Sequence, residues 1–547
     1  MQDGEGEWLE FAARPMRLRN TYKLGDLSVH KELHDEVVEM LRPIPQRLRG
    51  AGKRMFASIY ARHDHFRDAT RQALRGVYEI VRRCRENARG GRIFSEDLLR
   101  KVANNRSGEC LIAKAGLPDR EAYILLCAAC HMESIEPPKV EKHPVTGMLC
   151  YGPAVKRMCC KRWWLRRLRT YHSRGFEATA RDLCVVSRKA QVYASDETVA
   201  RVEARAEENV SMLELMEAVC EETGEAVSLA EIATHSLANP ALRRGEIMMR
   251  TRGFDEYAQS LGYSAVMVTT TCPSRFHPVL SKTGAANPRY EGATPRDSQA
   301  HLCGNWARAR AKIKRREIDV FGLRVAEPHH DGTPHHHYLL FAPADRMDEV
   351  KAILTEYALR DSPEEPGAQV RRITFVDIDR SNGGSAAGYV AKYISKSLDG
   401  FGLQEDLLGL DITESVKRVV AWARTWGIRQ FQQFGGPRVG LWREARRVRE
   451  EVAGAPEGFE LIRKCADSGD WAGFCKYSKN LDFYKEHSDR ENAYGEMMNE
   501  SVKGLLFKGW VVVTRPLSWL VKVTKTAMEK PSMMILGADY ESRGCLI

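Results

Sequence analysis

The middle of the chain alternates between β-branched runs and helical repeats, which is the pattern of an α+β domain. Ser264–Cys272 is rich in valine and threonine and lies between Gly262 and Pro273, as expected of a strand. The same criteria predict strands at Phe321–Ala326, Tyr338–Phe341 and Arg372–Ile378, and helices at Arg296–Arg316, at Met347–Leu359 and up to Ser397. Asp331-Gly332 marks a turn between two of these strands. We therefore expect a hairpin within an antiparallel sheet with flanking helices.

The pattern on both sides of this domain is mainly helical. Ser195 opens an amphipathic segment that is predicted to be one helix as far as Cys220, with acidic residues in its first turn. The sequence thus predicts a helical, basic N-terminal region, an α+β domain, a helical extension and a helical C-terminal region. Their predicted bounds are 1–245, 246–400, 401–455 and 456–547.

Composition and charge narrow the choice of partners. A chain of 547 residues exceeds what one hydrophobic core usually serves, and a net charge of +11 favours a polyanionic partner. Two basic clusters, Lys161–Arg169 and Lys312–Arg316, are candidates for phosphate contacts, and the first marks the N-terminal region as a candidate for DNA binding. Trp163 and Trp164 within the first cluster either stack on unpaired bases or belong to the core.

Neither secretion nor a membrane span is expected. The N-terminus has no apolar segment, and the apolar stretch Leu505–Thr514 is too short to cross a bilayer. The fourteen cysteines therefore read as reduced thiols in a cytosol. Two interpretations remain for the Cys127-x-x-Cys130 pair and the cysteines downstream of it, a structural Zn²⁺ site or buried free thiols. Those downstream cysteines are Cys150, Cys159 and Cys160.

The segment Glu327–His337 concentrates five histidines and two acids. On a strand, His335 and His337 share one face, about 7 Å apart, and can chelate a divalent cation. A hairpin loop with an odd number of residues would place Glu327 on that face, opposite His337. The result would be a site with two histidines, one carboxylate and open positions for phosphate oxygens. An even loop would turn Glu327 away and leave His329 or Asp331 as the third ligand.

Tyr389 and Tyr393 are one helical turn apart, so their side chains lie on one face. A phenol with a pKa of roughly 10 is a weak nucleophile at neutral pH. A bound metal, Lys392 or Lys396 would stabilise the phenolate, which could then attack a phosphodiester and conserve its bond energy as a phosphotyrosine. Two tyrosines would permit two successive transfers. Alone, such a pair usually reflects core packing, but the neighbouring histidine cluster favours the catalytic interpretation.

These motifs resemble a known family. Glu-x-His-x-Asp-Gly-x-Pro-His-x-His followed by Tyr-Val-Ala-Lys-Tyr-Ile-Ser-Lys resembles the replication gene A proteins of tailed bacteriophages, which are HUH (His-hydrophobe-His) rolling-circle endonucleases. Thr270–His277 and Gly436–Glu444 are also similar to segments of this family, and the likeness is strong from about Arg243 to Arg449. The chain departs from the motif at His336, where the family has a hydrophobic residue. A slip of one residue in strand register would change which imidazoles bind.

The resemblance implies roles by position: metal ligation by His335, His337 and Glu327, nucleophilic attack by Tyr389 and Tyr393, and proton transfer or phosphate contact by Lys392. The implied metal is Mg²⁺ or Mn²⁺, of which histidine ligands favour Mn²⁺. The implied activity is site-specific nicking and rejoining of one strand of supercoiled phage origin DNA in the bacterial cytoplasm. The nick would leave a 5′-phosphotyrosine and a 3′-hydroxyl primer for a host polymerase. A phosphate-binding loop motif is missing from the sequence, so a host helicase is the expected unwinding partner.

Three other readings remain open on sequence alone. The first is a metal-dependent hydrolase that uses water, with the tyrosines as bystanders. The second is a non-enzymatic initiator that binds and melts DNA. The third is a relaxase or transposase of a mobile element, which would share the HUH chemistry and differ in its substrate.

Overall fold

The computed structural model describes residues 31–60, 66–88, 94–143, 146–380, 385–406, 408–487, 491–497 and 500–524. The chain divides into two compact units. The first comprises Met1–Thr198, Ser274–Pro295 and His330–Thr333, and the second comprises Val199–Pro273, Arg296–His329 and Pro334–Ile547. Within the described ranges, no helix is long and apolar enough to cross a membrane.

The first unit is mainly helical, as predicted. Its helices are α2 (Lys31–Met40), α3 (Gln46–Tyr60), α4 (Phe66–Ala88), α5 (Glu96–Ala113), α6 (Asp119–Met132), α7 (Gly152–Met158) and α8 (Lys161–Asp182), and β1 (Glu141–Lys142) pairs with β2 (Leu149–Cys150). The start of α8 packs with α5, α6 and α7, and its end packs with α2, α3 and α4. Trp163 and Trp164 are 1% and 0% exposed in the first of these cores. The interpretation of these tryptophans as base-stacking residues is therefore wrong.

The helix predicted from Ser195 ends earlier than expected. It is α9 (Asp196–Glu214), and the next residues form β3 (Met216–Cys220), which pairs with β4 (Ala226–Ser228) and β13 (Trp519–Val523). Met216, Ala218 and Cys220 are buried while the residues between them are half-buried. This period of two is that of a strand, and pairing with a distant segment, β13, overrides the local helical pattern.

The expected antiparallel sheet is present in the second unit and has five strands. Their order is β8 (Ile373–Asp377), β5 (Tyr263–Thr270), β7 (Pro334–Pro343), β6 (Phe321–Pro328) and β9 (Phe431–Phe434). Each adjacent pair is antiparallel. The pattern predicted the first four strands, with bounds shifted by a few residues. It missed β9, which is short and ends at Gly435-Gly436.

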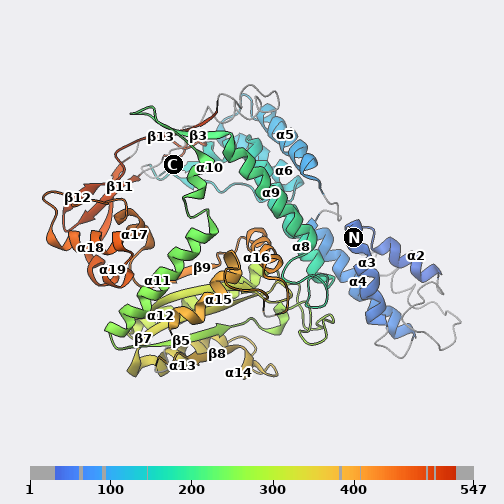
Figure 1. Ribbon diagram of the computed structural model, residues 1–547. Helices are drawn as coiled ribbons and strands as arrows, with labels where there is room; N and C mark the ends of the chain where they lie inside the picture. The colour runs from blue at the N-terminus through green and yellow to red at the C-terminus, as the bar shows by residue number, and fades with distance from the viewer. Residues whose placement is uncertain are drawn as a thin grey trace. The chain divides into compact units, whose positions relative to one another are not determined.

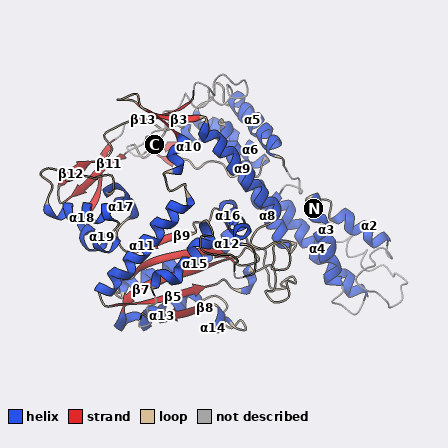
Figure 2. Cartoon of the chain, in the orientation of Figure 1, coloured by secondary structure: helices blue, strands red, loops and turns tan. Residues whose placement is uncertain are grey.

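Helices cover both faces of this sheet (Figure 1). One face packs on α11 (Pro240–Ser260) and α15 (Ala386–Leu398) through Ala265, Met267 and Leu339, among other residues. The opposite face packs on α12 (Pro295–Arg315) and α13 (Met347–Ala358) through Val268 and Leu340. Figure 2 shows these helices in blue beside the red strands. Because both faces are buried, the central strands are nearly continuous apolar runs rather than alternating ones.

The C-terminal part differs most from prediction. The remaining elements of the second unit are α10 (Leu229–Thr234), α14 (Ala368–Arg371), α16 (Ile412–Trp426), α17 (Val439–Ala445), α18 (Glu457–Ser468), α19 (Trp471–Tyr477), β10 (Leu481–His487), β11 (Glu500–Phe507) and β12 (Trp510–Val513). Phe507 pairs with Trp510, so Lys508 and Gly509 form a two-residue turn, with φ of 50° and 87°. Such a turn favours a hairpin of β-branched strands. The prediction that residues 456–547 are helical is therefore wrong for the described strands.

The carboxylate of Asp255 ties the start of α15 to α11. Its Oδ2 accepts a hydrogen bond from the backbone N–H of Ala386 at 2.9 Å, and its Oδ1 accepts two from the guanidinium of Arg380 at 3.1 and 2.6 Å. Ser385 caps the same helix end by accepting from the N–H of Gly388. The tyrosines on α15 are therefore held by a buried carboxylate on a neighbouring helix.

We expect Asp255→Ala to lower the free energy of unfolding by about 2–4 kcal/mol, because it leaves Arg380 and the backbone N–H of Ala386 without their acceptor. Urea denaturation followed by circular dichroism measures this loss. The control is Asp345→Ala, which removes an exposed carboxylate. Equal stability of the two variants would contradict the anchoring role.

Candidate metal centre and tyrosine helix

The paired ends of β6 and β7 bring together Glu327, His335 and His337. Glu327 pairs with His335, and Pro328 pairs with Pro334, so the loop between them is residues 329–333, an odd number. Glu327 therefore shares a face with both histidines, as predicted for an odd loop, although it lies opposite His335 rather than His337. The candidate ligand atoms all lie within 4.8 Å of one another. Among the described residues this is the only such group of three or more His, Cys, Asp or Glu side chains. We refer to it as the triad.

The electrostatics of the triad suit a divalent cation. Burial, reinforced by Lys396 and Lys392, lowers the pKa of His337 to about 3. Burial also lowers the pKa of His335 well below its usual value. Both imidazoles are thus neutral at physiological pH, the form that ligates metals. Burial raises the pKa of Glu327 to about 7, and Lys396 opposes this shift. The Nδ1 of His335 is buried with no hydrogen-bond partner in the described structure.

Side chains around the triad orient it. The Oγ1 of Thr269 lies 2.9 Å from Nδ1 of His337, which leaves Nε2 facing the Oε2 of Glu327 at 3.9 Å. The hydroxyl of Ser397 donates to the Oε1 of Glu327 at 3.2 Å, and the Nζ of Lys396 lies 4.0 Å from Oε2. Thr269 and Ser397 were not among the residues predicted to form the site. The available signal for Ser397 was its position one helical turn after Tyr393.

Helix α15 brings Tyr393 against the triad. The rings of Tyr393 and His337 stack with centroids 4.1 Å apart and planes 26° apart. Burial, and then the charge of Glu327, raise the pKa of the Tyr393 phenol. Tyr389, one turn earlier, is 41% exposed. The exposed Lys392 places its Nζ 5.0 Å from the ring centroid of Tyr393. The predicted residues thus gather around one helix, with Tyr393 half-buried against the triad and Tyr389 exposed.

His336 faces the opposite side of the sheet. Its Nδ1 lies 3.0 Å from the hydroxyl of Tyr338, and its Nε2 lies 2.9 Å from Oε1 of Gln299. The side chain is fully buried. Both ring nitrogens are therefore occupied within the protein, and His335 and His337 are the imidazoles on the triad's face.

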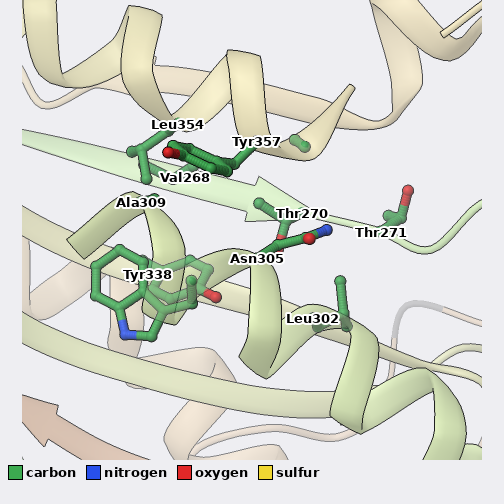
Figure 3. Close-up of a pocket in the computed structure, with 11 residues that line it drawn as sticks. Val268, Thr270, Thr271, Leu302, Asn305, Ala309, Tyr338, Leu354 and Tyr357 are labelled. Carbon is green, nitrogen blue, oxygen red and sulfur yellow. The ribbon is translucent and has the colours of Figure 1, made fainter. Parts of the chain in front are cut away.

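The sheet face that carries Tyr338 is closed by packing. A cavity of about 20 Å³ lies between β5, β7, α12 and α13. Figure 3 shows Val268 and Tyr338 on the sheet, Leu302 and Asn305 on α12, and Leu354 and Tyr357 on α13 around it. A volume of this size holds roughly one water molecule. This face therefore supports the sheet, and the candidate chemistry lies on the other one.

Asp331, one of the alternative ligands, is committed to the turn. Its Oδ1 accepts from the N–H of Thr333 at 2.9 Å, and its Oδ2 lies 2.8 Å from Nδ1 of His277. His329, the other alternative, places its ring centroid 4.2 Å from that of His335. Neither belongs to the triad, which takes its carboxylate from Glu327.

The described cysteines do not assemble a zinc site. Cys110 and Cys130 are buried in the core that contains Trp163. Burial raises the pKa of Cys130 to about 12 and that of Cys110 to about 11, which favours thiols over the thiolates that bind zinc. No three of the described cysteines converge as ligands. Of the five candidate ligands, Cys130 is buried and the other four are half-buried, so the interpretation as free thiols is favoured over a structural Zn²⁺.

Comparison with known proteins places this geometry in context. Residues 118–401, more than half of the chain, match the family model described as bacteriophage replication gene A protein. The replication gene A protein of Escherichia phage 186 is 40% identical over 75% of this chain, and that of Escherichia phage P2 is 33% identical over 72%. A probable replication endonuclease from a prophage-like region of Salmonella paratyphi A is 32% identical over 66%.

The alignments cover only part of each relative. The chain spans 62%, 54% and 48% of the lengths of these three proteins. No solved structure matches it. The family match includes the triad and both tyrosines of α15. The chain belongs to the bacteriophage replication gene A protein family.

Proposed function

We propose that the chain is a metal-dependent DNA endonuclease of the HUH type, which nicks one strand at a phage replication origin through a tyrosine and later rejoins it. One observation carries this proposal. The ring of Tyr393 stacks on His337, so a candidate nucleophile lies against a candidate ligand of a buried set of two histidines and one carboxylate. Open positions on such a set suit phosphate oxygens.

The residues take complementary roles in this proposal. Glu327, His335 and His337 would hold Mg²⁺ or Mn²⁺, which when bound would polarise a phosphate oxygen and stabilise negative charge. The phenolic oxygen of Tyr393 bonds to phosphorus, and its proton passes to solvent. The bond from phosphorus to the 3′-oxygen breaks, and this oxygen takes a proton from solvent, leaving a 3′-hydroxyl and a 5′-phosphotyrosine.

Other side chains of α15 support this step. Lys392, exposed beside the Tyr393 ring, contacts the phosphate. Lys396 balances the charge of Glu327. Tyr389, exposed one turn away, is the second nucleophile, which accepts the strand in a later transfer so that the freed 3′-end can close the circle.

The names of the relatives support the reaction class. One is described as a probable replication endonuclease and two as replication gene A proteins. The proposed substrate is accordingly supercoiled or single-stranded origin DNA. A host polymerase would extend the 3′-hydroxyl, and a host helicase would unwind the duplex. A relaxase or transposase would use the same residues on a different DNA site.

Incubation with supercoiled DNA that carries its origin, in the presence of Mn²⁺, should yield nicked circles and a denaturation-resistant protein–DNA adduct. We expect mass spectrometry to place the first adduct on Tyr393. Tyr393→Phe should lower first-round nicking by about 1,000-fold or more, because it removes the nucleophile. The control Tyr477→Phe changes an exposed tyrosine of α19 and should be neutral. Nicking without an adduct by a Tyr389→Phe, Tyr393→Phe double variant would indicate a water-using hydrolase instead.

Removal of divalent ions by EDTA should abolish nicking, and Mn²⁺ should restore it. At about one hundred times its dissociation constant, Mn²⁺ should stabilise the wild-type fold by roughly 2.7 kcal/mol. A His335→Ala, His337→Ala double variant should lose both the nicking and this stabilisation, whereas His235→Ala, at an exposed helix end, should keep them. Metal-dependent nicking by the double variant would rule out the triad as the metal site.

Thr269→Val should weaken Mn²⁺ binding by about 10–100-fold, because it removes the hydrogen bond that orients His337. Valine keeps the shape and strand preference of threonine, so the fold should be retained. The matched control is Thr374→Val at the exposed position paired with Thr269 on β8. Isothermal titration calorimetry on both variants measures the difference, and equal affinities would count against the orienting role.

A further inference from the structure

A cleft lined by arginines lies beside α17 in the second unit. Its volume is about 510 Å³, and its lining residues are Arg443, Arg446, Arg447, Arg449 and Thr514. All four arginines are exposed. Between residues 438 and 449 the sequence carries five arginines and a single acid, Glu444. Guanidinium groups stay charged in proteins, so the cleft concentrates positive charge.

The acids near this cleft neutralise it only in part. Glu444 is buried and accepts from Thr514 and Arg515, while Arg447 lies 3.6 Å from it. Glu246 of α11 accepts two hydrogen bonds from Arg443. Within the described structure, the side chains of Arg446 and Arg449 have neither a hydrogen bond nor an ion pair. By contrast, the predicted basic clusters at Lys161–Arg169 and Lys312–Arg316 contain pairs such as Arg169–Glu96 and Lys312–Glu356.

The positive charge continues from this cleft to the end of the sheet that carries the triad. Arg243 lies one turn before Glu246 on α11, and its guanidinium lies 5.6 Å from the ring centroid of Phe431 on β9. Partial burial, then repulsion from Arg443 and Arg429, lower the pKa of Arg243, so both of these charges lie within electrostatic range of Arg243.

Arg429 marks the end of this series nearest the triad. It immediately precedes Gln430, whose carbonyl accepts from the N–H of Ala326 on β6 at 2.7 Å. Ala326 is the neighbour of Glu327 along the chain. Arg243 and Arg429 are both exposed.

We propose that six exposed arginines bind the phosphate backbone of the DNA strand whose phosphodiester lies at the triad. These residues, named here the arginine track, are Arg243, Arg429, Arg443, Arg446, Arg447 and Arg449. This inference rests on the proposed function, since it locates the strand that the tyrosines cut. Guanidinium forks bind phosphates in a bidentate manner, and a strand with one negative charge per nucleotide offsets the repulsion among the track residues. An acidic protein segment would also complement the charge of the cleft, but it would not explain why the positive charge continues as far as the triad.

Fluorescence anisotropy with a labelled single-stranded oligonucleotide tests the arginine track. Metal-free protein with Tyr389→Phe and Tyr393→Phe separates binding from cleavage. Adding Arg446→Gln and Arg449→Gln should weaken binding by about tenfold at low salt. It should also reduce the slope of log K against log salt by about 1.4, which corresponds to two lost phosphate contacts on single-stranded DNA. Lysine at both positions should restore most of the slope, and Arg243→Gln with Arg429→Gln should lower the slope as well.

The matched control removes the same number of charges from arginines that already have acidic partners. Arg252 pairs with Glu256, and Arg438 pairs with Asp482, each at 2.9 Å. Arg252→Gln with Arg438→Gln should change the affinity less than twofold. A track variant that binds like this control would overturn the proposal.

Two further arms decide what the track binds. A duplex of the same sequence should bind with a smaller dependence on Arg446 and Arg449 than the single strand, and an equal dependence would overturn the assignment to one strand. Polyglutamate that binds as tightly as DNA, with the same arginine dependence, would show a protein partner instead. Nicking by the protein with intact tyrosines is scored separately. If the protein nicks DNA but the track variants bind and nick as it does, the arginine track is refuted and the catalytic proposal stands. If the track variants lose binding but the protein with intact tyrosines never nicks, the catalytic proposal is refuted and the track stands.

Discussion

The candidate site in the second unit depends on the burial of one carboxylate beside two neutral imidazoles at the end of a strand pair. Glu327 is 1% exposed, and burial raises its pKa to about 7. A buried carboxylate is costly unless it is paired and hydrogen-bonded. Two neighbouring residues of α15 meet part of that requirement: Ser397 donates a hydrogen bond to Glu327, and Lys396 places a positive charge near it. A divalent cation would meet the rest, because it favours the ionised carboxylate that desolvation opposes.

This constraint explains why one helix carries so many roles. The apolar side of α15 packs on the sheet through Val390, Ile394 and other buried residues. The next positions around the helix present Lys396 and Ser397 to Glu327 and stack Tyr393 on His337. The position of the phenol is therefore set by core packing rather than by a loop. Sites on rigid elements hold their geometry more precisely than sites on loops.

Both ends of this helix are tied to α11. Asp255 accepts a hydrogen bond from the backbone N–H of Ala386, the first residue of α15. Just beyond the last turn of α15, the carboxylate of Asp399 accepts a hydrogen bond from Nε of Arg244 at 2.8 Å. The same α11 holds Arg443 of the arginine track through Glu246. Helix α11 thus contacts both α15, which carries the candidate nucleophiles, and the basic cleft beside α17. Both lie within the second unit. This connection gives the proposed strand path and the proposed chemistry a common structural support.

Local periodicity in the sequence was enough to predict the main features of the site. Alternation along β7 put His335 and His337 on one face, and helical spacing aligned Tyr389 with Tyr393, because these periodicities follow from backbone geometry alone. Most elements of the central domain followed from the same rules. The side chain of Glu327 was predicted to share the face of the two histidines only if the hairpin loop had an odd number of residues, and the sequence alone did not give that number.

Tertiary structure decided what depends on contacts between distant segments. The pairing of β3 with β13 ended the helix predicted as far as Cys220, and the pairing of β6 with β9 created a strand with almost no local pattern. The register that sets Thr269 beside His337, and the approach of Arg243 to Phe431, likewise join residues far apart in sequence. Local propensity is worth only fractions of a kcal/mol per residue, so burial and pairing between distant segments override it wherever the two conflict.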